Sequence, residues 1–314
     1  MNSEEEKYML RCIQLAQNGL CNTAPNPMVG AVIVCDGKII GEGYHVRCGE
    51  AHAEVNAIRS VKDTSLLKRS TIYVSLEPCS HYGKTPPCAD LIIEKQIPRI
   101  VIGCRDPFSK VAGRGIQKLK DAGREVIVGV LETECRQLIR RFITFHTLRR
   151  PYITLKWAES SDRYIDYSRT DGKPVILSSP LTSMLVHKKR AEHSAILVGT
   201  RTAELDNPGL NVRHWYGRSP VRIVLDRQQK LSPSLHLFDG SNTKSSPTTS
   251  GRFTNIPSVA SSSYCSSSDI SGNLSFNPNS RYFIPLVLKN RFSGNPLLSC
   301  QSFNSSTVGL SSMI

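Results

Sequence analysis

One histidine, one glutamate and two cysteines stand at a spacing that could build a catalytic metal site. His52 and Glu54 lie two residues apart at the start of a helix-like stretch. Cys79 follows a strand-like stretch, and Cys88 opens the next helix-like one. One imidazole and two thiolates make three zinc ligands and leave a fourth position for water, whose pKa the metal lowers to about 7. Glu54 is spaced to move that water's proton without binding the metal.

This combination is typical of hydrolytic deaminases of nucleobases, in which His-x-Glu precedes Pro-Cys-x-x-Cys. The chain departs from that signature because eight residues, SHYGKTPP, separate Cys79 from Cys88. The spacing therefore requires a longer metal loop. A closed structural zinc site, or unrelated buried cysteines, is the alternative interpretation. A structural site ordinarily has four protein ligands and has no need of the glutamate.

The elements that would position these residues alternate between helix and strand. A helix is expected at 4–18 and ends at Gly19, and the dipeptide Asp36-Gly37 predicts a tight turn between two antiparallel strands. Further helices are expected at 51–61, 88–96, 115–123 and 134–147, and strands at 70–77, 99–104 and 125–132. Such alternation favours an α/β sandwich with helices on both faces of a sheet.

A second unit begins after the basic boundary Arg149-Arg150-Pro151. Strands are expected at 152–160, 194–200 and 220–226, with a helix at 179–193. From about residue 231 the sequence becomes rich in serine and loses both the 3.6-residue and the two-residue period, which is typical of disorder. We therefore expect domains at 1–148 and 151–240, and a divergent tail at 241–314 that is disordered or read out of frame. A natural linker or interaction tail is the rival explanation.

Composition narrows the class of protein. With 39% hydrophobic residues and a start that lacks a basic and apolar leader, the chain is expected to be a cytoplasmic globular enzyme without a membrane partner. The formal charge of +14 lies in short helical clusters without interleaved aromatic residues, which favours solvated helix faces or an anionic substrate over nucleic acid. A non-catalytic basic zinc-binding module that binds RNA stays open as an alternative.

Three stretches, PNPMVGAVIV, HAEVNAI and EPCSHYGKTPPC, resemble the deaminase domain of the bifunctional riboflavin biosynthesis deaminase/reductase family. The resemblance implies a cytidine-deaminase-like three-layer fold and hydrolysis of a ring amine of diaminohydroxyphosphoribosylaminopyrimidine, with release of ammonia. It also implies residue roles: zinc ligands His52, Cys79 and Cys88, proton shuttle Glu54, base contact Asn26, and sugar-phosphate contacts His81 and Lys84. A zinc deaminase of another base or nucleoside, of the cytidine or transfer-RNA type, is the alternative enzyme.

The second unit resembles the reductase domain of the same family through YITLKWAESSD, the segment 188–213 and PVRIVLD. The implied reaction is hydride transfer from NADPH that opens the ribosyl group to ribityl, in a partial α/β dihydrofolate-reductase-like domain. Implied cofactor contacts are Ala158, Ile176, Thr202 and Asp206, and implied substrate contacts are Arg190, Leu210 and Arg213. The arginine pair suits a phosphate, since guanidinium groups bind phosphate with two hydrogen bonds.

Two departures from the family are visible in the second unit. Arg163 stands where the family has a glycine after the aspartate. The resemblance stops near residues 236–240, before the glycine-rich segment that would close over the cofactor phosphates. We therefore expect an active deaminase joined to an incomplete and inactive reductase, in a chain that forms a homo-oligomer.

Overall fold

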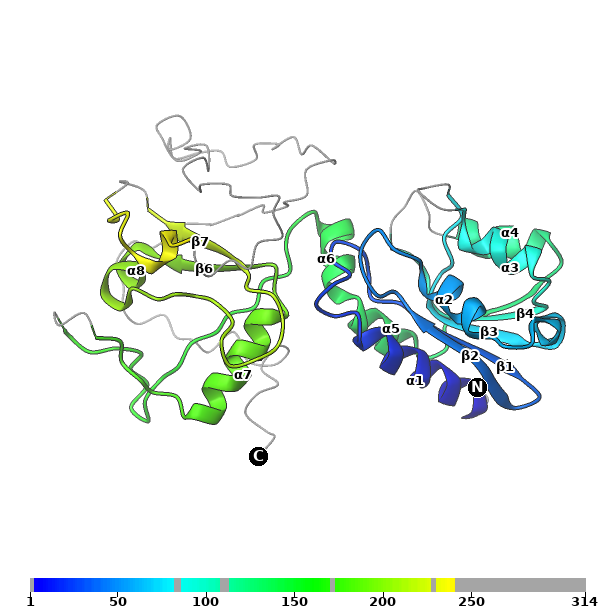
Figure 1. Cartoon of the computed structure of the whole chain (residues 1–314), viewed down its shortest axis with the longest axis horizontal. Helices are drawn as coiled ribbons and strands as arrows, with labels where there is room; N and C mark the ends of the chain where they lie inside the picture. Colours follow the sequence, from blue (N-terminus) through cyan, green and yellow to red (C-terminus); the bar gives the residue numbers. More distant parts are fainter. Residues whose placement is uncertain (1–2, 82–85, 108–112, 170–172, 227–229, 241–314) are drawn as a thin grey trace.

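The computed structural model describes residues 3–81, 86–107, 113–169, 173–226 and 230–240, which form two lobes (Figure 1). Lys84 and the tail 241–314 lie outside the described residues. The lobes are joined through helix α6 and the segment that follows it (Figure 1). Within the described part of the chain, no helix has the length and apolar character needed to cross a bilayer.

The first lobe is built on a sheet of order β2-β1-β3-β4-β5. Its strands are β1 (Gly30–Cys35), β2 (Lys38–Tyr44), β3 (Thr71–Leu76), β4 (Arg99–Cys104) and β5 (Glu125–Val128). Strand β1 pairs antiparallel with β2 and β3, whereas β3, β4 and β5 are parallel. The expected hairpin turn is confirmed: Asp36 and Gly37 have φ of 50° and 71°, the left-handed backbone that a tight two-residue turn requires.

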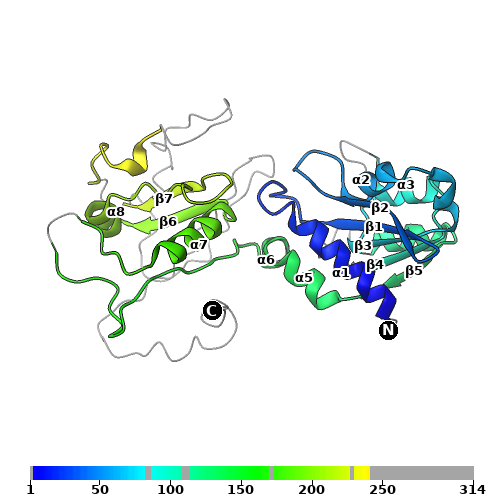
Figure 2. The ribbon, with the colours of Figure 1, turned by 60° about the horizontal axis from the view of Figure 1, so that its bottom comes forward.

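Helices cover both faces of this sheet, so that the lobe has three layers (Figure 2). Side chains of α2 (Ala53–Ser60), α3 (Cys88–Glu94) and α4 (Arg114–Asp121) pack on one face against Ile33, Ile72 and Ile100. Side chains of α1 (Ser3–Gln17) and α5 (Glu132–Leu138) pack on the other face against Val32 and Val101. Successive strand residues point to opposite faces, so the apolar run of β1 supplies both cores.

Glycines of β2 allow helix α2 to lie directly on the strand. A Cβ atom at Gly43 would lie 2.3 Å from the Ala57 nitrogen, and one at Gly41 would lie 2.6 Å from the Ala57 carbonyl oxygen. Both separations are far inside van der Waals contact, so only glycine permits this approach. The approach matters because α2 begins directly after His52 and carries Glu54.

Most of the expected helices and strands of the first lobe are confirmed, with two corrections. The strand expected at 125–132 ends at Val128, where Gly129 follows with φ of 99°, and Glu132 already begins α5. The helix expected at 134–147 is two helices, α5 and α6 (Arg140–Leu148), that meet at Ile139, where φ is −102° and ψ is 19°. These angles lie outside the helical region, although the Ile139 N–H still donates to the Cys135 carbonyl oxygen and its own carbonyl accepts from the Ile143 N–H. The short helix η1 (Thr64–Arg69), capped by the Asp63 side chain, links α2 to β3.

The second lobe contains α7 (Pro180–Ala191), β6 (Ala195–Gly199), α8 (Thr200–Asp206), β7 (Val221–Leu225) and the short helix η2 (His236–Phe238). The two strands are parallel neighbours in their own sheet. A small core of Ala203, Leu210, Leu231 and Leu237 lies beside them.

The strand expected at 152–160 is wrong, since those residues form no strand. Alternating apolar residues predict a strand only where a neighbouring strand supplies the hydrogen bonds, and none of the described residues pairs with this segment. Ile153, Leu155 and Trp157 are consequently exposed, Leu155 to 77%.

Candidate zinc and catalytic site

The candidate metal ligands meet at the carboxyl end of β3, where α2 and α3 begin. His52 directly precedes α2, Cys79 lies three residues past β3, and Cys88 is the first residue of α3. Their ligand atoms all lie within 4.8 Å of one another. The structure thus brings together three residues that the sequence separates by up to 36 positions.

The distances between these atoms fit a tetrahedral zinc ion. The Nδ1 atom of His52 lies 3.6 Å from the Cys79 sulfur and 3.3 Å from the Cys88 sulfur. Bonds of about 2.3 Å to sulfur and about 2.0 Å to nitrogen at tetrahedral angles would separate nitrogen and sulfur by roughly 3.5 Å. One nitrogen and two sulfur donors are also the ligand types that zinc prefers among first-row metals.

Hydrogen bonds prepare Cys79 to bind a cation. The Cys88 thiol lowers the pKa of Cys79 most, and His52 and the Cys88 main-chain N–H, 3.3 Å from the Cys79 sulfur, act in the same direction. The Cys79 thiolate in turn raises the pKa of His52. The thiolate is the form of cysteine that binds metal, so the site holds the charge that a cation would neutralise.

Glu54 lies in the first turn of α2 and is 3% exposed. Burial raises the pKa of its carboxyl to about 7, and the nearby Cys79 thiolate adds to the increase. A carboxyl group with a pKa near neutrality can both accept and donate a proton at physiological pH. Its position two residues from His52 places a proton-transfer group beside the ligands.

Asn26, the residue expected to contact the base, lies next to this cluster. Its side-chain nitrogen is 3.2 Å from Nε2 of His45, whose Nδ1 is 3.1 Å from the carbonyl oxygen of Ala51. Because a carbonyl only accepts, Nδ1 of His45 carries the proton and Nε2 accepts from Asn26. The ring of His45 meets that of His52 edge to face at 5.4 Å.

His45 is a residue that the sequence analysis missed. It is 3% exposed, and burial lowers its pKa, so the neutral ring fixes the orientation of the Asn26 amide. Its position after the glycine-containing strand β2 and close before His52 was the available signal. Of the loop residues, His81 is exposed and contacts none of these groups in the described hydrogen bonds, and Lys84 lies outside the described residues.

In the second lobe the two arginines expected to contact substrate converge on Asn211. Arg190 of α7 donates to the Asn211 carbonyl oxygen, and Arg213 donates to the Asn211 side chain. Leu210, also expected to contact substrate, is buried next to Asn211. Two neighbouring guanidinium groups could bind an anion.

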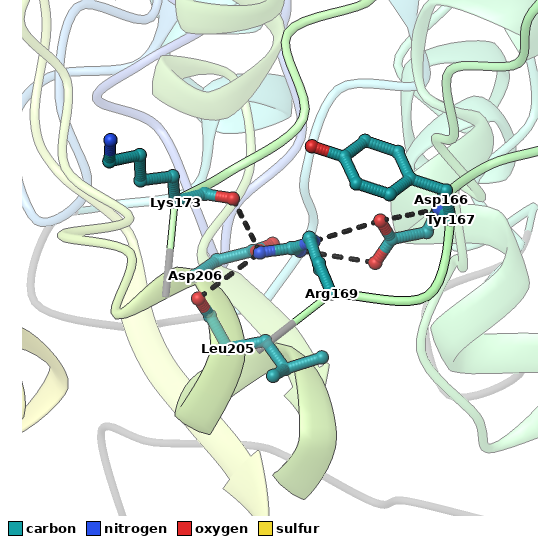
Figure 3. A network of polar contacts seen from close by, with 6 residues as sticks. All are labelled: Asp166, Tyr167, Arg169, Lys173, Leu205 and Asp206. Atoms are coloured by element: carbon teal, nitrogen blue, oxygen red, sulfur yellow. Dashed lines mark hydrogen bonds and ion pairs between the residues drawn. The ribbon is translucent and has the colours of Figure 1, made fainter. Parts of the chain in front are cut away.

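The expected cofactor residues Thr202 and Asp206 share α8, and Asp206 belongs to an ion-pair network (Figure 3). Arg169 pairs with Asp206 and, at 2.9 Å, with Asp166, and its side chain is only 4% exposed. Arg169 also donates to the carbonyl oxygens of Lys173 and Leu205. Sequence reasoning missed this arginine, because its partner Asp206 lies 37 positions further along the chain and nothing local to Arg169 suggests it.

Two further residues expected to contact the cofactor, Ala158 and Ile176, make no described contact with this network. Ala158 is half-buried in the segment without strand structure, and Ile176 is 84% exposed. Arg163, which the resemblance expects to stand at a glycine position, has φ of 68°. A left-handed backbone of this kind favours glycine, so the departure falls at a position where glycine has a conformational reason to occur.

Comparison with family models gives two matches. Residues 2–104 match the cytidine and deoxycytidylate deaminase zinc-binding region, and residues 151–256 match the RibD C-terminal domain. The first match contains His52, Glu54, Cys79 and Cys88. The second contains the arginine pair and the Arg169 network.

Similar proteins include the riboflavin biosynthesis protein RibD of Aquifex aeolicus, 42% identical over 78% of this chain and 67% of that protein. RibD of Escherichia coli is 41% identical over 73% of this chain and 65% of that protein. Among solved structures, the deaminase/reductase from Thermotoga maritima is 45% identical, covers 77% of this chain and 68% of that one, and has a TM-score of 0.71. The chain therefore spans about two thirds of the length of these relatives.

Proposed function

Because the chain belongs to the RibD family of riboflavin biosynthesis proteins, we propose that its first lobe deaminates a phosphoribosylated aminopyrimidine. The Thermotoga relative is a diaminohydroxyphosphoribosylaminopyrimidine deaminase. The observation that carries the proposal is the placement of His52 Nδ1 between the Cys79 and Cys88 sulfurs, with buried Glu54 beside them.

The residues divide the work of a hydrolytic deamination. His52, Cys79 and Cys88 would hold zinc, which when bound supplies a hydroxide nucleophile near neutral pH. Glu54, with a pKa near 7, would take one proton from the attacking water and deliver it to the ring nitrogen. It would then carry the second proton, from the hydroxyl added to the ring carbon, to the departing amine, so that ammonia leaves as the carbonyl forms. Asn26, oriented by His45, would hold the edge of the base.

The sugar phosphate would extend toward the loop between the two cysteines. His81 and Lys84 are the residues of that loop proposed to contact it. Both can donate hydrogen bonds to an anion, and positive charge in the chain as a whole favours an anionic substrate. His81 is exposed, and so is accessible to such a ligand.

For the second lobe we propose the role of an NADPH-dependent reductase half that is incomplete. Ala158, Ile176, Thr202 and Asp206 would contact the cofactor, and Arg190, Leu210 and Arg213 the substrate. The exposure of Leu155, Trp157 and Ile176 supports incompleteness, since apolar side chains of this size are normally covered in a finished domain. Sustained NADPH oxidation with the deaminated substrate would contradict this part of the proposal.

The proposal also includes a cytoplasmic location and assembly into a homo-oligomer. Eight cysteines among the described residues carry free thiols, a usage common in reducing compartments. Fractionation of cells and the mass of the purified protein in solution are the corresponding measurements.

The decisive experiment measures ammonia release from diaminohydroxyphosphoribosylaminopyrimidine by the zinc-loaded full chain, next to Glu54→Gln and Glu50→Gln. Glu50 is exposed and lies four positions before Glu54, so its variant is a matched control. We expect Glu54→Gln to lower the rate by about 10²–10⁴-fold with zinc still bound, and Glu50→Gln to match the parent. No ammonia from the parent, or release from cytidine instead, would refute the proposed substrate.

A further inference from the structure

A second buried carboxylate, Glu77, lies two residues before the candidate ligand Cys79 and is 3% exposed. It is not among the ligands, because its oxygens are fully engaged by main-chain groups. Oε2 accepts from the N–H groups of Asp106 at 3.2 Å and Gly113 at 3.0 Å, and Oε1 accepts from Gly115 at 3.0 Å and Ile116 at 3.3 Å.

These donors belong to two places in the fold. Asp106 follows β4, whereas the other three donors form the beginning of α4. The N-cap of α4 is Gly113, with φ of 79° and no side chain of its own to cap the helix. Glu77 supplies that cap from a different element, and the positive end of the helix dipole favours a carboxylate there.

The contact fixes the main chain that leads to Cys79. A Cβ atom at Gly115 would lie 2.0 Å from the carbonyl oxygen of Pro78, so the first turn of α4 packs directly on the Pro78 main chain. From the other side, Ala89 of α3 donates to the Cys79 carbonyl oxygen at 3.1 Å. The residue pair Pro78–Cys79 is thus held between the first turns of two helices.

We propose that Glu77 is a positioning residue for the metal site: by capping α4 it fixes Pro78–Cys79 and so sets the distance between the Cys79 sulfur and His52 Nδ1. This inference rests on the zinc site of the proposed function. A glutamine at position 77 would keep the size of the side chain but replace one acceptor oxygen with an NH₂ group. Two main-chain N–H groups would then face another donor instead of an acceptor.

The test measures metal binding rather than activity, on the full chain. Zinc affinity is obtained by competition with a chromogenic chelator, and cobalt substitution reports the thiolate-to-metal charge-transfer absorption. We expect Glu77→Gln to weaken zinc binding about 10–100-fold, as loss of groups that orient ligands generally does, and to shift the cobalt spectrum. Leu119→Ala is the matched control, because it removes buried contacts of α4 and leaves the Glu77 carboxylate intact.

A purely structural role would give a different pattern. Zinc affinity and a cobalt spectrum like the parent's in Glu77→Gln would overturn the inference, as would an equal loss in Leu119→Ala. If Glu77→Gln fails to fold, Gly115→Ala serves instead: its Cβ must displace the Pro78 carbonyl, so a shifted cobalt spectrum is expected and an unshifted one counts against the idea. Failure of the parent itself to bind zinc would overturn the zinc site first and this inference with it.

Discussion

The sheet of the first lobe and the sheet of the second lobe bury their strands to very different extents. Every residue of β1 is buried, and so are five of the six residues in each of β3 and β4. In β6 none is fully buried, and in β7 only Ile223 is. A chemical site needs side chains locked by packing on rigid elements, and the candidate ligands lie in the lobe that provides this.

The difference is also visible in what holds each functional residue. Cys79 and Glu54 are fixed by packed helices and main-chain hydrogen bonds, whereas Asp206 is held by an ion pair to Arg169. The Asp206 side chain is 28% exposed, and an ion pair with a partly exposed partner is more sensitive to salt than buried packing. The first lobe is therefore built for a fixed geometry, and the second depends on polar contacts.

Removal of the metal is expected to have the largest effect, and it tests whether the two lobes behave independently. Chelation removes the zinc, and Cys88→Ser leaves only two of its three protein ligands. Either change is expected to abolish ammonia release. Fluorescence of the second lobe should not change, since both tryptophans of the chain, Trp157 and Trp215, lie there. Added zinc should restore the chelated parent, and Cys48→Ser, at an exposed thiol, should behave like the parent. A tryptophan signal that collapses on chelation would show that the lobes are not independent.

A pair of truncations compares the two cores directly. Ile102→Ala, at a residue of β4 that is 0% exposed, is expected to lower the free energy of unfolding of the first lobe by about 2–5 kcal/mol. Leu155→Ala, at a side chain that is 77% exposed, is expected to change the second lobe by less than about 0.5 kcal/mol. Urea titrations followed by zinc release and by tryptophan fluorescence separate the lobes. A large loss in Leu155→Ala would mean that a partner covers this residue in solution.

A smaller difference should appear with pH. Burial, together with the positive charge of Arg190 and Arg213, lowers the pKa of His187 to about 4, and its Nδ1 accepts from the Arg213 N–H. The unfolded histidine titrates near 6.5, so the folded lobe favours the neutral ring. Its stability should be complete above about pH 6.5 and fall as the pH drops toward 4.

Tryptophan fluorescence in urea at pH 7 and pH 5 measures this effect. His187→Asn, whose side-chain oxygen can still accept from Arg213, should lose less stability between the two pH values than the parent. Parallel losses in the parent and the variant would exclude His187 as the cause.

The smallest expected effect is that of substitutions at Arg163, whose backbone is left-handed. Arg163→Gly removes the strain of a left-handed backbone, about 1–2 kcal/mol, but adds freedom to the unfolded chain worth about 0.4–1 kcal/mol. The net gain should therefore lie between about 0 and 1.6 kcal/mol, measured by the urea midpoint of tryptophan fluorescence. Arg163→Ala keeps the Cβ atom and should gain nothing, so equal gains in both variants would point to the arginine side chain instead.

Local patterns were sufficient to predict that His52, Cys79 and Cys88 come together, and they predicted most elements of the first lobe. The residue types and spacing of His52, Glu54 and Cys79 predict a metal site, and the hairpin at Asp36-Gly37 follows from backbone preference alone. The strand expected at 152–160 failed because strand formation depends on a partner that the segment itself does not specify. The split of the helix at Ile139 is likewise not marked in the sequence, since residues 134–147 contain neither glycine nor proline.

Residues whose partners are distant in sequence could not be predicted. Glu77 reads as an acidic residue at a strand end, and only the folded chain shows its bonds to residues 29 to 39 positions away. His45 lies 19 positions from Asn26, and neither residue suggests the other. The contacts of Glu77 and His45 exist only once the chain has folded, so no local pattern in the sequence predicts them.

The close approach of α2 to β2 limits how this site can be redesigned or can diverge. Any side chain at Gly41 or Gly43 would push the helix away from the sheet and carry Glu54 with it. Of residues 46–50, which follow β2 and are all exposed, only Gly49, with φ of 88°, is restricted by its backbone. Substitution at Gly41 or Gly43 should therefore disable the existing chemistry before it creates a new one, whereas the other exposed residues of 46–50 can change without moving α2.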